Sequence, residues 1–233
     1  MQLFYTENIE NNVATLTEEE SLHCIKVLRK QEGDAITVVD GKGGWYEGTI
    51  ISGSKKKCKI SIQKTETAYK KRSFHLHIAI APTHQIARYE WFLEKATELG
   101  IDEITPILCY HSERRKVRTD RHQKIILSAM KQSMKAYLPK LNEPVKLEQF
   151  IKNQANNGLK FIAWCDYENN VHLKEKYKVG QDVCILIGPE GDFSKKEVEL
   201  ALENGFSPIG LGESRLRTET AGVAACLVVN LVE

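Results

Sequence analysis

Residues 184–233 read CILIGPEGDFSKKEVELALENGFSPIGLGESRLRTETAGVAACLVVNLVE, and the fold class follows from this stretch. Its first four residues are apolar, which is typical of a fully buried strand, and the glycines and proline at 188–191 predict a turn directly after it. Ser194 and Glu197 have the spacing of a capping box, so a helix should begin there and end at the following Asn-Gly pair. A second buried strand is expected over residues 206–211.

The loop at 212–220 carries two arginines and two glutamates, and the helix from about Thr220 is apolar on every side. Such a helix must be buried all round, in a core or against a second copy of the chain. The turn at 188–191 and this loop are expected to follow neighbouring parallel strands, whose carboxyl ends are where open α/β sheets bind ligands. Glycines there let backbone approach a ligand closely, so we interpret the two loops as a binding site rather than ordinary turns.

The composition, with 42% hydrophobic and 27% charged residues in a chain of 233, is that of an ordinary folded protein with one large domain or two modest ones. No apolar run is long enough to span a membrane, and the start has no signal-peptide pattern. Six scattered cysteines without a C-x-x-C pair favour reduced thiols in a cytoplasm, and no metal site is expected.

The net charge of +2 is unevenly distributed, because residues 111–140 alone carry +7 and leave −5 for the rest. One strongly basic segment in a nearly neutral chain predicts a polyanion bound at a defined place.

Residues 1–70 predict a small β-rich domain, because short strands with turn signals between them are typical of a small barrel. Thr17 and Glu20 form a second capping box, which predicts a helix to about Arg29. From residue 71 to 233, strands alternate with helices, the mark of an α/β fold with a mostly parallel sheet.

A long helix is expected over residues 121–138, ended by Pro139. Its basic residues recur every three or four positions and should lie along one face. With the basic loop before the helix, they favour a track for an RNA backbone over a merely solvated face.

Two motifs resemble those of a known family. GPEGDFS at 188–194 is similar to GPEGG-(F/L)-S, and LGESRLRTETA at 211–221 to LG-x-R-(I/V)-LRTETA, of the 16S ribosomal RNA uracil-N3 methyltransferases, the RsmE family of the SPOUT superfamily. HCIKVLR at 23–29 resembles the H-x-x-x-V-L-R element of the family's amino-terminal domain. Asp192 departs from the pattern by replacing a glycine, and Thr83-His84-Gln85 stands where a lysine is common.

The resemblance implies a SPOUT-type α/β sheet with a C-terminal trefoil knot, preceded by a PUA-like RNA-binding β-barrel, with domains at 1–70 and 71–233. It also implies a cytoplasmic homodimer that methylates the N3 nitrogen of a specific uridine in 16S ribosomal RNA of the small ribosomal subunit. The methyl donor would be S-adenosyl-L-methionine, which becomes S-adenosyl-L-homocysteine.

The residues expected to hold the donor lie in the two loops and beside them: Leu186, Ile187, Gly188, Pro189, Glu190, Gly191, Leu211, Gly212, Leu216, Thr218 and Ala221. Two catalytic roles are expected. Arg217 would stabilise the negative charge that develops on the base, and Glu219 would receive the proton or orient Arg217. Glu219 is explained equally well as a negative charge that stabilises the amino-terminal end of a helix. Glu190 is a second carboxylate within reach, so the sequence does not decide which residue accepts the proton.

The residues expected to contact RNA combine the basic segment with the amino-terminal domain: Lys26, Arg29, Arg88, Arg114, Arg115, Arg118, Arg121, Lys124, Lys131 and Lys135.

Two other functions compete with RNA uracil methylation. A SPOUT enzyme could methylate a transfer RNA or a ribose 2′-oxygen instead, and a non-catalytic RNA-binding protein would share the barrel and the basic helix but not the loop at 212–220. A dinucleotide-dependent oxidoreductase is disfavoured, because no G-x-G-x-x-G fingerprint opens a helix.

Overall fold

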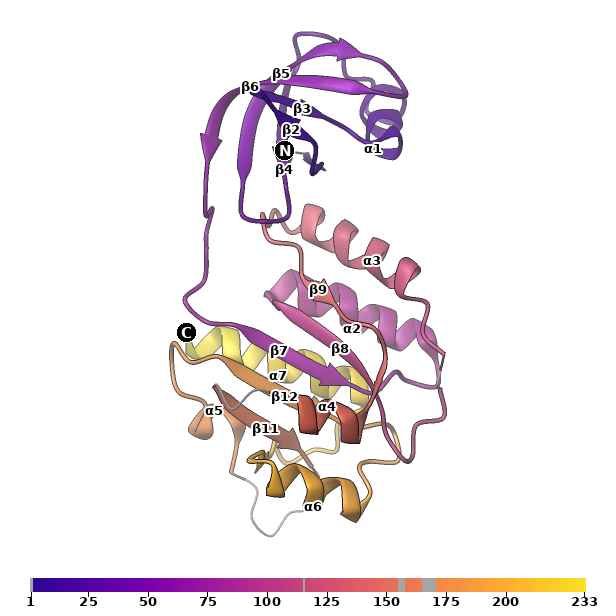
Figure 1. Cartoon of the computed structure of the whole chain (residues 1–233), viewed down its shortest axis with the longest axis vertical. Helices are drawn as coiled ribbons and strands as arrows, with labels where there is room; N and C mark the ends of the chain where they lie inside the picture. Colours follow the sequence, from indigo (N-terminus) through magenta and orange to yellow (C-terminus); the bar gives the residue numbers. More distant parts are fainter. Residues whose placement is uncertain (1, 115, 155–157, 165–170) are drawn as a thin grey trace. The chain divides into compact units, whose positions relative to one another are not determined.

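The computed structural model describes residues 2–114, 116–154, 158–164 and 171–233. Contacts divide the chain into two compact units, residues 1–71 with 127–138, and residues 72–126 with 139–233 (Figure 1). The segment 127–138 therefore packs with the first unit, although it lies far beyond the expected boundary near residue 70. Among the described residues, no helix is long and apolar enough to cross a membrane.

The first unit is a curled six-stranded sheet (Figure 1). Its strands are β1 (Leu3–Tyr5), β2 (Ile9–Glu10), β3 (Val13–Thr15), β4 (Ala35–Val39), β5 (Trp45–Gly53) and β6 (Cys58–Glu66). Their order is β1-β4-β5-β6-β3-β2, with β1 and β4 parallel and the other neighbours antiparallel. Two register shifts between β5 and β6 bend the sheet.

The predicted helix up to Arg29 is shorter and less regular than expected. The side-chain oxygen of Thr17 accepts a hydrogen bond from the Glu20 N–H at 3.3 Å and begins α1 (Glu18–Leu22). A π-helical turn, η1 (His23–Val27), follows directly. The Arg29 backbone then takes a φ of 55°, which ends the helical path.

Residues 127–138 join the first unit through an apolar cluster. Met130 and Ala136 pack there with Leu3, Val39 and Trp45. An ion pair between the partly buried Lys131 and the buried Glu20 also ties this segment to the sheet. These contacts explain why the segment belongs to the first unit.

The second unit is built on a seven-stranded, wholly parallel sheet in the order β10-β8-β7-β12-β11-β13, with β9 also paired to β8. Its elements are β7 (Leu76–Ile80), α2 (Ile86–Leu99), β8 (Glu103–Leu108), the first part of α3 (Thr119–Gln132), β9 (Lys140–Leu141), β10 (Val145–Lys146), α4 (Leu147–Asn153), β11 (Leu159–Ala163), α5 (Leu173–Lys176), β12 (Val183–Ile187), α6 (Lys195–Glu203), β13 (Ser207–Ile209) and α7 (Thr218–Val232). Residues 127–132 of α3 belong to the first unit. The expected alternation of strands and helices is confirmed.

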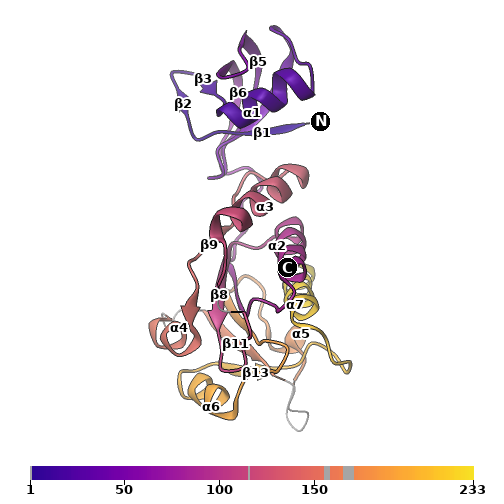
Figure 2. The same ribbon diagram turned by 90° about the vertical axis from the view of Figure 1, so that its right-hand side faces the viewer.

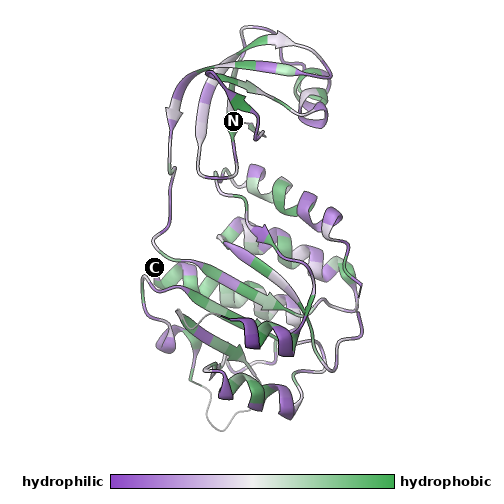
Figure 3. Cartoon of the chain, in the orientation of Figure 1, coloured by the Kyte–Doolittle hydropathy of each residue, from purple (hydrophilic) through white to green (hydrophobic). Residues whose placement is uncertain are grey.

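Helices cover both faces of this sheet. Figure 2 shows α2 and α7 on one face and α4 and α6 on the other. All five residues of β7 and all five of β12 are buried, and the central strands are correspondingly apolar in Figure 3. The site described below therefore stands on a rigid, fully packed core.

The last helix, α7, is buried on one side only within this chain, so of the two expected alternatives, burial in a core or against a second copy, the chain's own core does not enclose it. At Gly222, a Cβ would lie 2.7 Å from the Phe92 ring and 2.9 Å from Ile80, so α7 packs closely on α2 and β7. On its other side Leu227 and Leu231 are 39% and 74% exposed.

The helix α3 ends at Gln132, six residues earlier than the expected stop before Pro139. Met134 takes a φ of 57°, and the Lys135 N–H donates to the Met130 carbonyl at 3.1 Å, a left-handed helix end normally made with glycine. Because no glycine marks this end, the sequence does not reveal it. The predicted basic stripe therefore stops before Lys135.

Candidate active site

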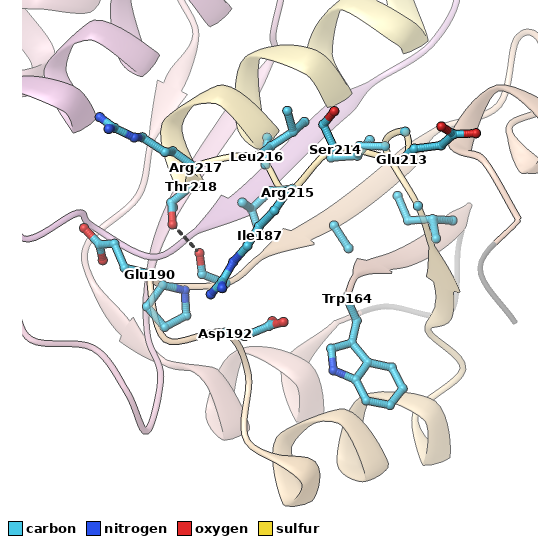
Figure 4. A pocket seen from close by; sticks show the side chains of 18 of the residues that line it. Trp164, Ile187, Glu190, Asp192, Glu213, Ser214, Arg215, Leu216, Arg217 and Thr218 are labelled. Carbon is cyan, nitrogen blue, oxygen red and sulfur yellow. Dashed lines mark hydrogen bonds between the residues drawn. The ribbon is translucent and has the colours of Figure 1, made fainter. Parts of the chain in front are cut away.

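A cavity of about 480 Å³ opens at the carboxyl ends of β11, β12 and β13 (Figure 4). Its lining comes from the ends of these strands, the loops after them and the start of α7: Ala163, Trp164, His172, Ile187, Gly188, Pro189, Glu190, Asp192, Ile209, Gly210, Leu211, Gly212, Glu213, Ser214, Arg215, Leu216, Arg217, Thr218 and Ala221. A cavity therefore lies at the end of the sheet, where the sequence predicts a binding site.

The strand order changes one part of that prediction. β12 and β13 are not neighbours, because β11 lies between them and pairs with both. The end of β11 therefore supplies Ala163 and Trp164 to the cavity, which the sequence reasoning did not anticipate. Alternation along β12 turns Ile187 toward the cavity, while Leu186 is fully buried in the core cluster on the side of α4 and α6.

The start of α7 is fixed to the turn after β12. Thr218 Oγ1 donates a hydrogen bond to the Gly188 carbonyl at 3.0 Å, and this bond is drawn in Figure 4. The turn itself leads into α6 through the predicted capping box, in which Ser194 and Glu197 exchange hydrogen bonds as expected. Glu197 Oε1 also accepts from the Tyr110 N–H at 2.7 Å, so the loop after β8 is anchored to the same turn.

The loop after β7 holds Glu190 in place. The His84 N–H donates to Glu190 Oε1 at 2.8 Å. Arg114 closes the same loop, because its guanidinium donates to the carbonyls of Thr83 at 3.2 Å and His84 at 2.9 Å. Thr83-His84-Gln85, which departs from the family pattern, therefore positions a cavity carboxylate through its backbone.

A buried carboxylate lies in the first turn of α7. Glu219 is only 7% exposed, and its Oε1 lies 3.7 Å from Arg88 Nε of α2. Its Oε2 is buried without a hydrogen-bond partner among the described residues. A buried carboxylate oxygen without a partner is costly, which points to a role for Glu219 beyond stabilising the helix start.

The two arginines of the loop at 212–220 point in different directions. Figure 4 shows the Arg215 side chain extending across the cavity, whereas the Arg217 side chain points away from Trp164 and the cavity floor. Both side chains are exposed. Arg217 also precedes α7 directly and accepts a backbone hydrogen bond from Ala221 at 2.7 Å, so its position is fixed by the helix.

A family model described as an RNA methyltransferase domain matches residues 70–230, and another described as an RNA methyltransferase PUA domain matches residues 16–63. The chain belongs to the RNA methyltransferase family. It is 27% identical to the ribosomal RNA small subunit methyltransferase E of Rickettsia conorii, over 96% of this chain and 91% of the relative.

Two solved structures are similar over nearly the whole chain. A probable rRNA-methyltransferase from Porphyromonas gingivalis is 42% identical with a TM-score of 0.93, covering 100% of this chain and 98% of the other. A ribosomal RNA small subunit methyltransferase E from Neisseria gonorrhoeae, bound to S-adenosyl methionine, is 25% identical with a TM-score of 0.85, covering 97% and 95%. The family resemblance expected from the motifs is confirmed.

In this methyltransferase, nine of the eleven residues expected to hold the donor line the cavity. The other two do not: Leu186 faces the core, and Gly191 is exposed beside His111, whose Cβ lies 3.0 Å from where a Cβ at Gly191 would be. Sequence reasoning missed Trp164, His172, Asp192 and Arg215. Trp164 could have been found from the sequence, because it is aromatic and directly follows the strand at 159–163.

The basic residues expected to contact RNA fall into two groups. Several are engaged within the chain: Arg88 with Glu219, Arg114 with the backbone at 83–84, Arg121 with Glu90 at 2.6 Å, and Lys131 with Glu20. Others are exposed, namely Lys26 and Arg29 in the first unit and Arg118 and Lys124 in the second. Arg115 lies outside the described residues.

Proposed function

We propose that this enzyme transfers a methyl group from S-adenosyl-L-methionine to the N3 nitrogen of a uridine in 16S ribosomal RNA, in the cytoplasm. The observation that carries the proposal is the cavity at the ends of β11, β12 and β13, with the buried Glu219 next in the chain to its lining residue Thr218. Two relatives named ribosomal RNA small subunit methyltransferase E support it, because they match nearly the whole chain and one of them binds S-adenosyl methionine.

The lining of the cavity fits this donor. Trp164, Ile187, Leu211 and Leu216 offer apolar surface for an adenine ring, and the glycines at 188, 210 and 212 leave the backbone of the lining without side chains. The donor's sulfonium supplies an already activated methyl group, so the protein's task is positioning and electrostatic stabilisation.

The N3–H of uridine must lose its proton before N3 can attack. We assign the proton to Glu219 Oε2, the carboxylate oxygen without a partner among the described residues, while Arg88 beside Oε1 orients the group. As the new N3–carbon bond forms, the carbon–sulfur bond breaks with its electrons remaining on sulfur. Arg217 stabilises the negative charge spread over the neighbouring carbonyl oxygens of the base.

Methylation of RNA with a radioactive methyl donor tests the function. The substrates would be small ribosomal subunits and 16S RNA lacking the modification, with total transfer RNA as the alternative. We expect label in 16S RNA and a reverse-transcription stop at one uridine, because a methyl group on N3 blocks base pairing whereas one on a ribose oxygen does not. Label in transfer RNA, or label at a ribose oxygen, would contradict the proposal.

We assign RNA backbone contacts to the exposed Lys26, Arg29, Arg118 and Lys124, together with Arg115 and Lys135 from the sequence prediction. Lys124→Glu should weaken RNA binding several-fold in a filter-binding assay, and more so at low salt, without changing donor affinity. Glu199→Gln on the exposed side of α6 is the matched control. An unchanged RNA affinity for Lys124→Glu would show that Lys124 is not part of the proposed RNA-binding surface.

The finer fold prediction also stays a proposal: domains at 1–70 and 71–233, a PUA-like first domain, and a C-terminal trefoil knot. The family model for residues 16–63 supports the first domain. The bond between Thr218 and Gly188 is compatible with the knot, because it holds the start of the last helix against the turn after β12. An experimental chain trace without a crossing of α7 through the loop at 188–194 would exclude the knot.

We further propose a homodimer that pairs through α2 and α7. Leu227 and Leu231 lie one turn apart on α7 and are exposed, and Trp91 of α2 is 43% exposed. Wild-type protein should have the mass of two chains in sedimentation, and Leu227→Glu with Leu231→Glu should shift it to one. A monomeric wild type would contradict the dimer.

A further inference from the structure

Among the described residues that line the cavity, Asp192 is the one carboxylate held in a left-handed backbone conformation. Its φ of 60° lies in the left-handed region, which is unfavourable for a residue with a side chain. Three hydrogen bonds fix it there. Its N–H donates to the Pro189 carbonyl at 2.9 Å, its carbonyl lies 3.0 Å from His111 Nδ1, and its Oδ1 accepts from the Phe193 N–H at 2.8 Å.

These bonds leave one carboxylate oxygen available to the cavity. Oδ2 has no hydrogen-bond or ion-pair partner within the described part of the chain, and Asp192 lines the cavity. In Figure 4 the carboxylate points into the cavity toward Trp164. The side chain is half-buried, so its charge is screened less than that of a surface group.

The charges around the cavity make this carboxylate prominent. The lining contains three acidic residues, Glu190, Asp192 and Glu213, and two arginines. Glu190 Oε1 accepts a hydrogen bond from the His84 N–H, and Glu213 is exposed. Arg217 points away from the cavity whereas Arg215 extends across it, so the three carboxylates and two guanidiniums of the lining leave a formal charge of −1.

We propose that Asp192 makes the site selective for the positively charged methyl donor over the neutral product. This inference rests on the proposed function. S-adenosylmethionine and S-adenosylhomocysteine differ by one methyl group and one positive charge on sulfur. A carboxylate in the cavity attracts that charge before methyl transfer and loses its partner afterwards, so product release is favoured by the reaction itself.

The size of the effect follows from Coulomb's law. Two unit charges about 6 Å apart across an effective dielectric constant of about 40, between that of a surface pair and water, change an affinity by roughly tenfold. We therefore expect the donor to bind roughly tenfold more weakly to Asp192→Asn, with the affinity for the product unchanged. Asparagine keeps the acceptor for the Phe193 N–H and tolerates the left-handed conformation, so the variant should fold.

Calorimetric titration of the full chain tests the proposal with three ligands: S-adenosylmethionine, S-adenosylhomocysteine, and sinefungin, in which an ammonium-bearing carbon replaces the sulfonium. Wild type, Asp192→Asn and Glu199→Gln would be compared at the same pH and salt, with thermal unfolding of each protein alone as the fold control. Glu199 is exposed on α6 and does not line the cavity. Glu199→Gln should therefore match the wild type.

We expect Asp192→Asn to lose affinity for S-adenosylmethionine and sinefungin together, and to keep its affinity for the product. Equal losses of affinity for all three ligands would show that Asp192 only shapes the loop. Unchanged affinities would show that the Asp192 charge does not act on the ligand. Either result overturns the inference but leaves the proposed donor site in place. A loss confined to S-adenosylmethionine would assign the effect to the methyl group and overturn it as well. A folded wild type that binds none of the three would instead remove the proposed function, and this inference with it.

Discussion

Glu219→Gln should slow methyl transfer by about 10²- to 10⁴-fold, the range that a positioned general base contributes. Glutamine keeps the size of the side chain but cannot accept the uridine proton. Glu219 is 7% exposed, and its Oε2 lacks a hydrogen-bond partner within the described chain, so an acceptor for a proton is already in place there. Single-turnover methylation at saturating donor and RNA measures the chemical step directly.

The pH dependence of the rate distinguishes a general base at Glu219 from a residue with a purely structural role. At higher pH a growing fraction of uridine has already lost its N3 proton, so the deficit of Glu219→Gln should shrink as pH rises. A residue that only holds the fold would give a deficit independent of pH and a lower melting temperature. Donor affinity and thermal unfolding of the variant should match those of Glu199→Gln, and a rate deficit that persists unchanged at high pH would contradict the assignment.

The sequence predicted local structure near the site well, because neighbouring residues determine it. The capping box of Ser194 and Glu197, the buried strand expected over 184–187, observed as β12 (Val183–Ile187), and the turn after it all form as expected. These features depend on contacts within a few positions of the chain. The same holds for the alternation of strands and helices that identified a parallel sheet.

Long-range pairing explains what was missed. Which strands of a parallel sheet are neighbours is set by crossover connections, so nothing in residues 184–211 indicates that β11 lies between β12 and β13 and brings Trp164 into the cavity. Similarly, Glu20 pairs with Lys131 across 111 positions of the chain, which helical spacing alone cannot reveal. The basic stripe on α3 is therefore partly neutralised within the protein.

Arg217→Ala should lower the turnover number by about 10²- to 10³-fold with little change in donor affinity, the loss typical of removing one donor that stabilises developing negative charge. Arg217 directly precedes α7, and its side chain points away from the donor cavity in Figure 4. That direction leaves its guanidinium free to face a base placed beside the donor. Arg217→Lys should recover only part of the rate, because a single ammonium cannot contact two carbonyl oxygens as a guanidinium fork can.

Arg215, two positions earlier, is the matched comparison for Arg217. Its side chain extends across the cavity, so Arg215→Ala should act mainly on the dissociation constant of the donor, while Arg217→Ala acts mainly on turnover. Calorimetry with S-adenosylmethionine and saturating turnover assays on both variants would separate the two roles. If Arg217→Ala kept full turnover, or if Arg215→Ala alone lost it, stabilisation of the uridine anion would have to be reassigned from Arg217 to Arg215, on the cavity side of the same loop.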